Sequence, residues 1–486
     1  MNQKISELEP KVVWGIFDKI TEIPRCSGRE QKLQNWVKKW ADENKIQFRS
    51  DDVGNILLTK DAKIGFEGYP TIVYQVHQDM VCEKLSSSKH NFENDPIETK
   101  IEGNYIVANG TTLGADNGIG ISLAMSSLID PEASRYGKIE VLMTVEEETT
   151  FKGASNVKRG FFTGKRMVNL DSEETGIIIT ESAGGGSTHY EIRDRLVDAR
   201  NLKGFSITVD GLLGGHSGVD IHQNRANAIK LVSSYIRKLS DIAQVRIAHF
   251  EGGTVANAIP RYARCDFLTE DKKQEMKGYN SIWAEGIRKE YPLEKTMKIT
   301  FSEKTLKKSF TRQKTNNLTK LIDEIPQGVI SWSKNIEGLV QTSNNLGIIR
   351  TEEDKIKLTL LSRGSDSVDL EKLRARLREI GEKCDVVTTQ SPPSTGWSTN
   401  SKSSFVKFVA EEYRDLMGNE PKITGIHGGL ECSAFSKLDP EIQIVSIGAT
   451  LESPHSPQER LEISGVNVVW NLIKSMSRDI IRESKF

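Results

Sequence analysis

The chain has 486 residues, and its 66 Lys and Arg are matched by 67 Asp and Glu, which leaves a formal net charge of −1 at neutral pH. A chain of this length exceeds what one hydrophobic core usually supports, so we expect two domains or three. Because the charges are interleaved, the composition excludes the basic field that nucleic acid or anionic lipid would need, and it is typical of a soluble globular protein.

The cysteines are too scattered for a disulfide framework or a CxxC zinc site. The five are Cys26, Cys82, Cys265, Cys384 and Cys432. The N-terminus, MNQKISELEPKVVW, lacks the apolar core of a signal peptide, and no apolar run reaches the length of a membrane span. We therefore expect a reduced, cytoplasmic protein, in which Cys82 and Cys432 are inert packing residues.

The first informative segment is a predicted strand at residues 72–76, which runs directly into His77 and Asp79. Its β-branched and aromatic residues are typical of a strand covered on both faces. Alternation places His77 and Asp79 on one face at the carboxyl end of the strand, where ligands collect in open α/β sheets. A structural histidine–carboxylate contact would also fit this pair, so the pair alone does not predict a site.

The next segment, residues 109–129, reads NGTTLGADNGIGISLAMSSLI. Its glycines bracket Asp116, and the periodicity that follows predicts a helix, so Asp116 lies in a tight loop that enters a helix. A helix-capping role for Asp116 is the simpler alternative. The loop has no GxGxxG and no GK[ST], which disfavours a phosphate site.

Two further predicted strands also end in carboxylates. The strand at 139–145 is followed by Glu146, Glu147 and Glu148, and the run at 167–170 by Asp171. Adjacent carboxylates repel one another unless a cation or a proton lies between them, although a solvated charge run is the usual explanation.

Near the C-terminus, a predicted strand at 442–447 precedes a loop that holds His455 between Pro454 and Pro457. Prolines restrict the backbone of such a loop and stiffen the presentation of the imidazole. Two imidazoles with three or four carboxylates and no thiolate are the ligands of a catalytic zinc site rather than a structural one. A carboxylate shared by two cations would suit the hydrolysis of an amide.

Six motifs in this order resemble the M20-type dinuclear zinc metallopeptidases, and among them the cytosolic aminoacyl-histidine (Xaa-His) dipeptidases. The motifs are VHQDM, TLGADNGIG, EEETTFKGA, NLDSEE, GLLGGHSGVDI and SPHSPQE, and they extend over almost the whole chain. The resemblance implies two Zn²⁺ per chain, or Mn²⁺ or Co²⁺ in their place.

The resemblance also implies the metal ligands. His77 and Asp171 would hold one zinc ion, Glu148 and His455 the other, and Asp116 would bridge them. Two imidazoles and three carboxylates would then complete the dinuclear site.

Asp79 would orient the His77 imidazole. In relatives a pair of glutamates precedes Gly-Ala by a short spacer, and here Gly153 and Ala154 select the last two of the three glutamates. Glu147 is then the general base and Glu148 the ligand, and Glu146 is left to solvent or to the strand end. Thr149 and Thr150 depart from the small residues that many relatives have there.

We expect an α/β fold, with a mixed-sheet zinc-peptidase catalytic domain of the phosphorylase/hydrolase-like kind and an inserted α+β lid domain. The catalytic domain would comprise residues 1–186 and 399–486, and the lid domain residues 187–398. Gly and Ser residues at 184–186 and 391–403 suit hinges.

Four residues outside the metal ligands are candidates for contacts with the substrate. His216, in GGHSG, has no evident acidic partner, and the resemblance implies that it donates to the oxyanion. Asn257 and Arg363 resemble residues that hold the free C-terminal carboxylate of the substrate. Glu431 is a candidate for the free amino group, whereas His427 is either loop structure or part of the site.

The sequence therefore predicts a metal-dependent dipeptidase that acts on unblocked dipeptides, with a water activated by two zinc ions and by Glu147. The partners expected are a small peptide substrate and a second copy bound through the lid domain, with no nucleic acid or membrane. An M20-type amidase that acts on N-acyl amino acids is the main alternative, and a scaffold protein with a decayed site is the other.

Overall fold

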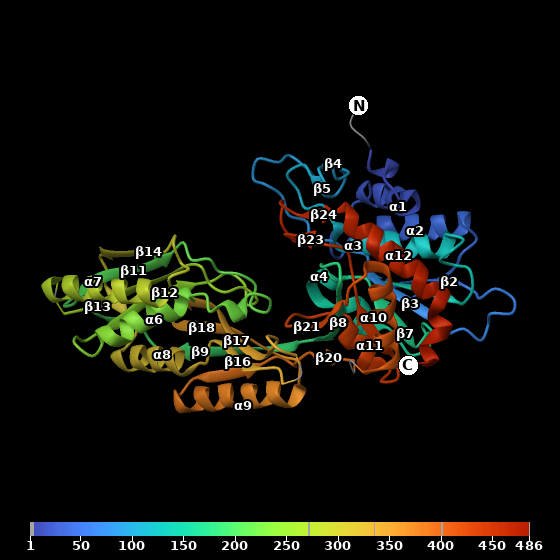
Figure 1. The fold of residues 1–486 in the computed structure, drawn as a ribbon. Coiled ribbons are helices and arrows are strands. Elements are labelled where there is room, and N and C mark those ends of the chain that lie inside the picture. The colour runs from blue at the N-terminus through green and yellow to red at the C-terminus, as the bar shows by residue number, and fades with distance from the viewer. Residues whose placement is uncertain (1–3, 271–272, 335, 400–401, 486) are drawn as a thin grey trace. The chain divides into compact units, whose positions relative to one another are not determined.

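The computed structural model describes residues 4–270, 273–334, 336–399 and 402–485, which form two compact units. Unit 1 comprises Met1–Glu181, Trp397–Gly425 and Leu430–Phe486, and unit 2 comprises Ser182–Gly396 and Ile426–Gly429. The blue N-terminal and red C-terminal segments of the chain both belong to unit 1 (Figure 1). Residues 426–429 belong to unit 2, although the predicted boundaries place them in the catalytic domain.

Unit 1 is built on a mixed sheet of nine strands among the described residues. The order is β1 (Gln47–Ser50), β2 (Ile56–Lys60), β6 (Ile139–Thr144), β3 (Ile72–His77), β7 (Arg166–Asn169), β22 (Gln443–Ser446), β8 (Ile177–Ser182) and β20 (Trp397–Ser398), with β21 (Lys422–Ile426) beside β8. The central strands β6, β3, β7 and β22 are parallel, and β1, β2 and β8 pair antiparallel. Every residue of β3 and β6 is buried, as expected for strands covered on both faces.

Helices and their apolar side chains build the core of unit 1 around this sheet. The helices are η1 (Ile5–Glu7), α1 (Lys11–Thr21), α2 (Gln31–Glu43), α3 (Ala115–Ile129), α4 (Glu147–Thr150), α5 (Lys152–Asn156), α10 (Ser404–Met417), α11 (Cys432–Leu438), α12 (Ile463–Asp479) and η3 (Ile480–Lys485). Helix α3 packs against α1, α12 and β3, and α10 packs against α12. The core includes Trp14, Phe17 and Tyr74.

A small antiparallel sheet in unit 1 carries the loop that holds His455. Its order is β23 (Leu451–Glu452), β24 (Arg460–Glu462), β5 (Tyr105–Ala108) and β4 (Thr99–Glu102). His455 lies between β23 and β24, so these short strands fix both ends of its loop. No helix in the described part of the chain is long and apolar enough to span a membrane.

Unit 2 combines an antiparallel sheet with four helices of eight residues or more among the described residues. The sheet order is β14 (Lys298–Glu303), β11 (Lys203–Asp210), β13 (Ala263–Thr269), β12 (Arg246–Gly252), β17 (Val340–Glu352), β18 (Lys355–Gly364), β9 (Gly184–Arg193) and β19 (Val387–Gln390), with β16 (Gly328–Trp332) beside β17. The helices are α6 (Ala228–Leu239), α7 (Lys273–Glu290), α8 (Arg312–Glu324) and α9 (Ser367–Lys383), and β10 (Val197–Asp198), β15 (Lys308–Ser309) and η2 (Ile221–Gln223) are minor elements.

Burial alternates strictly along β18, with one residue in two facing the core. This alternation is typical of an antiparallel sheet with one packed face, and it contrasts with the continuous burial in β3 and β6. The prediction of a mixed α/β fold is confirmed, whereas the action of unit 2 as a lid stays a prediction.

Candidate metal centre

The polar residues singled out in unit 1 follow the carboxyl ends of three adjacent parallel strands. β3 ends at His77, β6 is followed by Glu147 and Glu148, and β7 by Asp171. The parallel pairing places these ends at one edge of the sheet, which is where open α/β sheets bind ligands. Asp116 reaches the same place from the start of α3.

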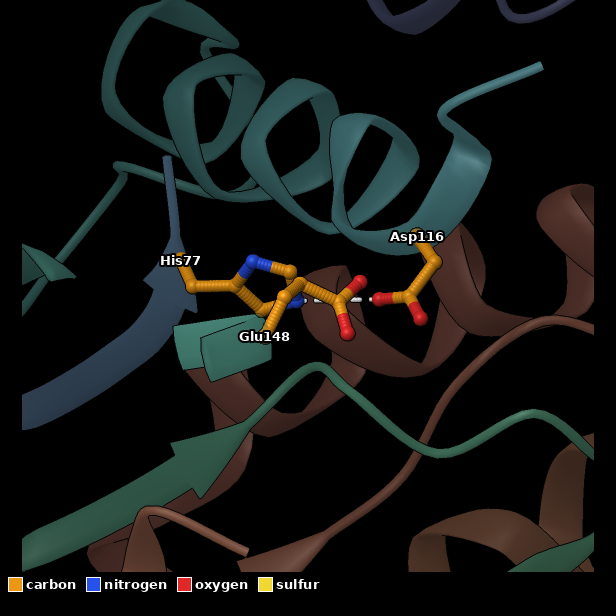
Figure 2. A group of neighbouring side chains, drawn as sticks. All are labelled: His77, Asp116 and Glu148. Carbon is orange, nitrogen blue, oxygen red and sulfur yellow. Dashed lines mark hydrogen bonds and ion pairs between the residues drawn. The ribbon is translucent and has the colours of Figure 1, made fainter. Parts of the chain in front are cut away.

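The five predicted metal ligands lie together in the structure. His77 Nε2 is 2.9 Å from Asp116 Oδ1 and 3.3 Å from Asp171 Oδ1. His455 Nε2 is 3.1 Å from Asp116 Oδ2 and 3.0 Å from Glu148 Oε2. Ligand atoms of His77, Asp116 and Glu148 all lie within 4.8 Å of one another (Figure 2). Each oxygen of Asp116 therefore faces a different imidazole.

The electrostatics of this cluster indicate an excess of negative charge. Burial, together with Asp116, raises the pKa of Glu148 to about 7. Burial opposes protonation of His455, but hydrogen bonds to Asp116 and Glu148 raise its pKa to about 11. Glu148 Oε1 is buried and has no hydrogen-bond partner among the described residues. Imidazoles and carboxylates with an unsatisfied oxygen are a donor set that fits a divalent metal ion.

Asp79 contacts both the His77 imidazole and the backbone of the two glutamates, Glu147 and Glu148. Its Oδ1 accepts the backbone N–H of Glu147 at 3.0 Å, and its Oδ2 accepts the N–H of Glu148 at 3.2 Å and the Ser27 hydroxyl at 2.7 Å. Oδ1 also lies 3.3 Å from His77 Nδ1, an ion-pair distance. Burial opposes ionisation, but His77 and Ser27 lower the pKa of Asp79 to about 2.

Glu147 and Glu146 have different surroundings. Burial, together with the carboxylates of Asp171 and Glu148, raises the pKa of Glu147 well above its ordinary value, and His77 opposes this effect. Glu146 has a φ of +52° and its carboxylate accepts from Lys152 Nζ at 2.6 Å. Glu146 is therefore paired with Lys152, whereas the buried carboxylate of Glu147 lies close to the carboxylates of the cluster.

Unit 2 brings His216 next to Arg363. His216 Nδ1 accepts the backbone N–H of Val219 at 3.1 Å, which assigns the proton of the neutral ring to Nε2. That Nε2 lies 3.3 Å from Arg363 Nη2, so two donors converge on one place. Asp220 Oδ2 accepts the backbone N–H of His216 at 2.9 Å and so holds the loop, whereas the role of the imidazole stays a prediction.

Arg363 is a guanidinium without a counter-charge. It lies on β18, burial lowers its pKa to about 10, and its Nε has no hydrogen-bond partner among the described residues. No salt bridge joins it to a carboxylate in that part of the chain. The planar guanidinium has the shape and charge that suit a carboxylate, so the predicted role of Arg363 stays a prediction.

The other predicted contacts are placed less directly. Asn257 is exposed, and its backbone carbonyl accepts the N–H of Ser217 at 2.8 Å, which sets it beside the His216 loop. His427 is buried in unit 2, its Nε2 is 2.7 Å from Ser343 Oγ, and burial lowers its pKa to about 3. His427 therefore carries no charge near neutral pH.

Glu431 lies fully buried in unit 1. Its Oε2 accepts from Gln75 Nε2 and Thr144 Oγ1, both at 2.6 Å, and burial raises its pKa to about 8. Gln75 and Thr144 belong to β3 and β6, so Glu431 lies beneath the metal cluster rather than at the surface. A role in holding the substrate's amino group stays a prediction.

A disulfide joins Cys26 and Cys82, with 5.7 Å between their Cα atoms. The expectations of fully reduced cysteines and of an inert Cys82 are wrong. Next to Cys26, the Ser27 hydroxyl donates to Asp79, so the disulfide lies close to this carboxylate. Cys432 is free and buried, and burial raises its pKa, as expected of a packing residue.

Comparisons with known proteins agree with this geometry. Peptidase family M20/M25/M40 matches residues 73–479. The chain is 34% identical over 481 residues to the cytosol non-specific dipeptidase of Escherichia coli, covering 98% of this chain and 99% of that protein.

Two solved structures resemble the chain over most of its length. The crystal structure of aminoacylhistidine dipeptidase from Vibrio alginolyticus has a TM-score of 0.84 and 32% identity, and the match covers 98% of each chain. Aminopeptidase PepT from Bacillus cereus has a TM-score of 0.57 and 15% identity, which is a likeness of fold alone.

Proposed function

The chain belongs to peptidase family M20/M25/M40, and from this premise we propose that it is a metal-dependent dipeptidase that hydrolyses the peptide bond of unblocked dipeptides, those of the Xaa-His type included. The observation that carries the proposal is the convergence of two imidazoles and three carboxylates at the carboxyl ends of parallel strands. The names of the relatives from Escherichia coli and Vibrio alginolyticus support dipeptides as the substrate class.

Two zinc ions, or manganese or cobalt in their place, would be held by the five ligands. His77 and Asp171 would take one ion and Glu148 and His455 the other, with Asp116 between them. The two oxygens of Asp116, each facing a different histidine, support this division. Bound there, paired cations would lower the pKa of a water and polarise the scissile carbonyl.

The proton transfers fall to Glu147. Its raised pKa suits a base that takes a proton from the attacking water and returns it to the leaving amine. Asp79 holds the backbone N–H of Glu147 and approaches His77, so it keeps the base and a ligand in register. No covalent intermediate is needed.

The dipeptide offers a carboxylate and an ammonium group for recognition. Arg363 would bind the carboxylate with the help of Asn257, and the Nε2–H of His216 would donate to the oxyanion that develops on the carbonyl. The proximity of His216 Nε2 and Arg363 Nη2, at 3.3 Å, supports the binding of negatively charged groups of the substrate beside them. Glu431 is the proposed partner of the ammonium group.

Two features of the setting complete the proposal. A homodimer through unit 2 is supported by the side chains of Ile330 and Trp332 on β16, which are 37% and 49% exposed. A cytosolic location is supported by the name of the Escherichia coli relative. Light scattering of the purified protein, with a Trp332→Glu variant, measures the dimer directly.

One experiment tests the function. Purified protein is analysed for metal per chain and assayed with L-alanyl-L-histidine and with N-acetyl-L-alanine, before and after chelation. We expect close to two metal ions, turnover of the dipeptide and loss of that turnover on chelation. Preference for the N-acetyl compound would favour an amidase, and failure to bind metal or to cleave either compound would refute the enzyme.

A further inference from the structure

A single buried carboxylate, that of Glu459, holds the loop that presents Asp116. Its Oε2 accepts the backbone N–H groups of Leu113 at 2.7 Å and Gly114 at 3.0 Å. Its Oε1 accepts those of Ala115 at 2.8 Å and Asp116 at 3.3 Å. Four successive N–H groups at the start of α3 thus share one acceptor, and the side chain is only 2% exposed.

The same residue belongs to the loop that presents His455. Glu459 follows His455 by four residues, and its backbone N–H donates to the carbonyl of Ser456 at 3.0 Å in a tight turn. Asp116 and His455 are 339 residues apart in the chain, and their side chains meet at 3.1 Å. Glu459 is therefore a direct link between the two loops.

Arg25 completes the link from the opposite side. Its buried guanidinium donates to the carbonyl of Gly114, and also to the carbonyls of Gln78 at 3.0 Å and Asp79 at 2.6 Å. The backbone of Gly114 is thus held at its N–H by Glu459 and at its carbonyl by Arg25. Because residues 78 and 79 follow His77 directly, this network also ties the end of β3 to the Asp116 loop.

A carboxylate at a helix N-terminus stabilises the helix whatever else it does, because it satisfies N–H groups that have no partner within the helix. A purely structural Glu459 would therefore affect the stability of α3 and nothing more. The position of Glu459 on the His455 loop distinguishes the two roles, since a structural cap needs no connection to a second ligand loop.

We propose that Glu459 is a positioning residue that sets the spacing between Asp116 and His455. Through this spacing it would set how tightly the protein binds the second metal ion, the one held by Glu148 and His455. This inference rests on the proposed metal centre. Glu459 itself contacts neither the reacting atoms nor the metal, and it acts through the backbone of the Asp116 loop. Partners of this kind, one step removed from the ligands, typically change metal affinity or activity by about 10–100-fold when they are replaced.

The test replaces Glu459 by Gln. The volume is retained, but one oxygen becomes an NH₂ group, so two of the four loop N–H groups lose their acceptor. We expect the affinity for the second metal ion to fall by about 10–100-fold, and kcat to fall at limiting metal with KM little changed. The visible spectrum of the cobalt-loaded protein, titrated ion by ion, reports the second site independently of turnover.

Glu452→Gln is the matched control. Glu452 precedes His455 by three residues, but its carboxylate accepts from Arg460 and from the Tyr105 hydroxyl instead of from the Asp116 loop. The same chemical change on the other side of the His455 loop should therefore leave the cobalt titration as in the wild type.

Hydrogen–deuterium exchange at residues 113–116 of the metal-free protein gives a second measurement, and exchange there should accelerate in Glu459→Gln alone. Should that variant not fold, Glu459→Asp, which withdraws the carboxylate by one methylene, is expected to show the same changes. A variant with a lower Tm but a wild-type cobalt titration would overturn this inference and leave the proposed function intact. Wild-type protein that takes up no metal would refute the proposed function together with it.

Discussion

Arg363 provides the sharpest test of how the substrate is recognised. The guanidinium is partly buried on β18 with no carboxylate partner among the described residues, and its Nη2 lies 3.3 Å from the Nε2 of His216. If the C-terminal carboxylate of a dipeptide fills that place, the enzyme should distinguish a dipeptide from its C-terminal amide. Arg363→Met removes the donors and the charge while it retains an unbranched apolar stem.

The magnitude follows from the bond that is lost. A hydrogen bond to a charged group contributes about 1.5–3 kcal/mol, and each ~1.4 kcal/mol is a factor of ten. We therefore expect kcat/KM for L-alanyl-L-histidine to fall by about 10–150-fold in Arg363→Met. The value for L-alanyl-L-histidinamide should change little, because the amide does not provide the charge that Arg363 pairs with.

The assay is a cycle of two enzymes and two substrates, with metal content measured in each sample. Arg350→Met serves as the control, because the Arg350 guanidinium lies in the same unit and is already occupied by the carbonyls of Gly252 and Ile349. The control should retain the preference for the free acid. Equal losses on the acid and the amide in Arg363→Met would refute the carboxylate role and leave Arg363 as a packing residue.

Three further predictions concern chemistry, metal and stability. Glu147→Gln should retain its metal and lose about two to four powers of ten in kcat, whereas Glu146→Gln should remain close to wild type. Asp116→Ala should lose both metal ions in elemental analysis, and a full complement would exclude bridging. His427 has its pKa lowered to about 3, against about 6.5 unfolded, so the unfolded chain binds the proton and stability is lost as pH falls below about 6.5. Urea titrations that follow unit 2 should show about 2 kcal/mol less stability at pH 5 than at pH 7, a difference absent in His427→Gln.

The sequence was most informative where local geometry decides the outcome. Continuous apolar runs predicted buried parallel strands. A polar residue that follows such a strand lies at the carboxyl edge of the sheet, beside the residues that follow the neighbouring strands. For this reason His77, Asp171 and Glu148 were expected together, and they lie together. The mixed α/β fold and the family resemblance drawn from six short motifs are confirmed.

Contacts between segments that are distant in the chain could not be predicted from the sequence. Glu459 is the last residue of SPHSPQE, a motif from which only His455 was assigned a role, and its partners lie more than 340 residues earlier in the chain. Cys26 and Cys82 are 56 residues apart with no motif around them, so nothing local marks them as a pair. A carboxylate that accepts only backbone N–H groups leaves no trace in the identity of its partners, because every residue except proline supplies one.

The unsatisfied groups of the two units have opposite chemistry. Unit 1 gathers three carboxylates around two imidazoles and leaves Glu148 Oε1 buried without a partner among the described residues. This excess of carboxylates suits cations. In unit 2 the Nε of Arg363 is buried without a hydrogen-bond partner among the described residues, and no carboxylate there neutralises its guanidinium, so the group suits an anion. A buried charge without a partner is costly, so such groups persist where a ligand supplies what the protein omits. In the proposed function, metal ions would bind the first group and the carboxylate of a dipeptide the second, and an N-blocked amino acid would supply its carboxylate equally well. The choice between dipeptidase and amidase therefore depends on the amino-terminal side of the substrate, where a free ammonium group needs a carboxylate such as Glu431 and an acyl group does not.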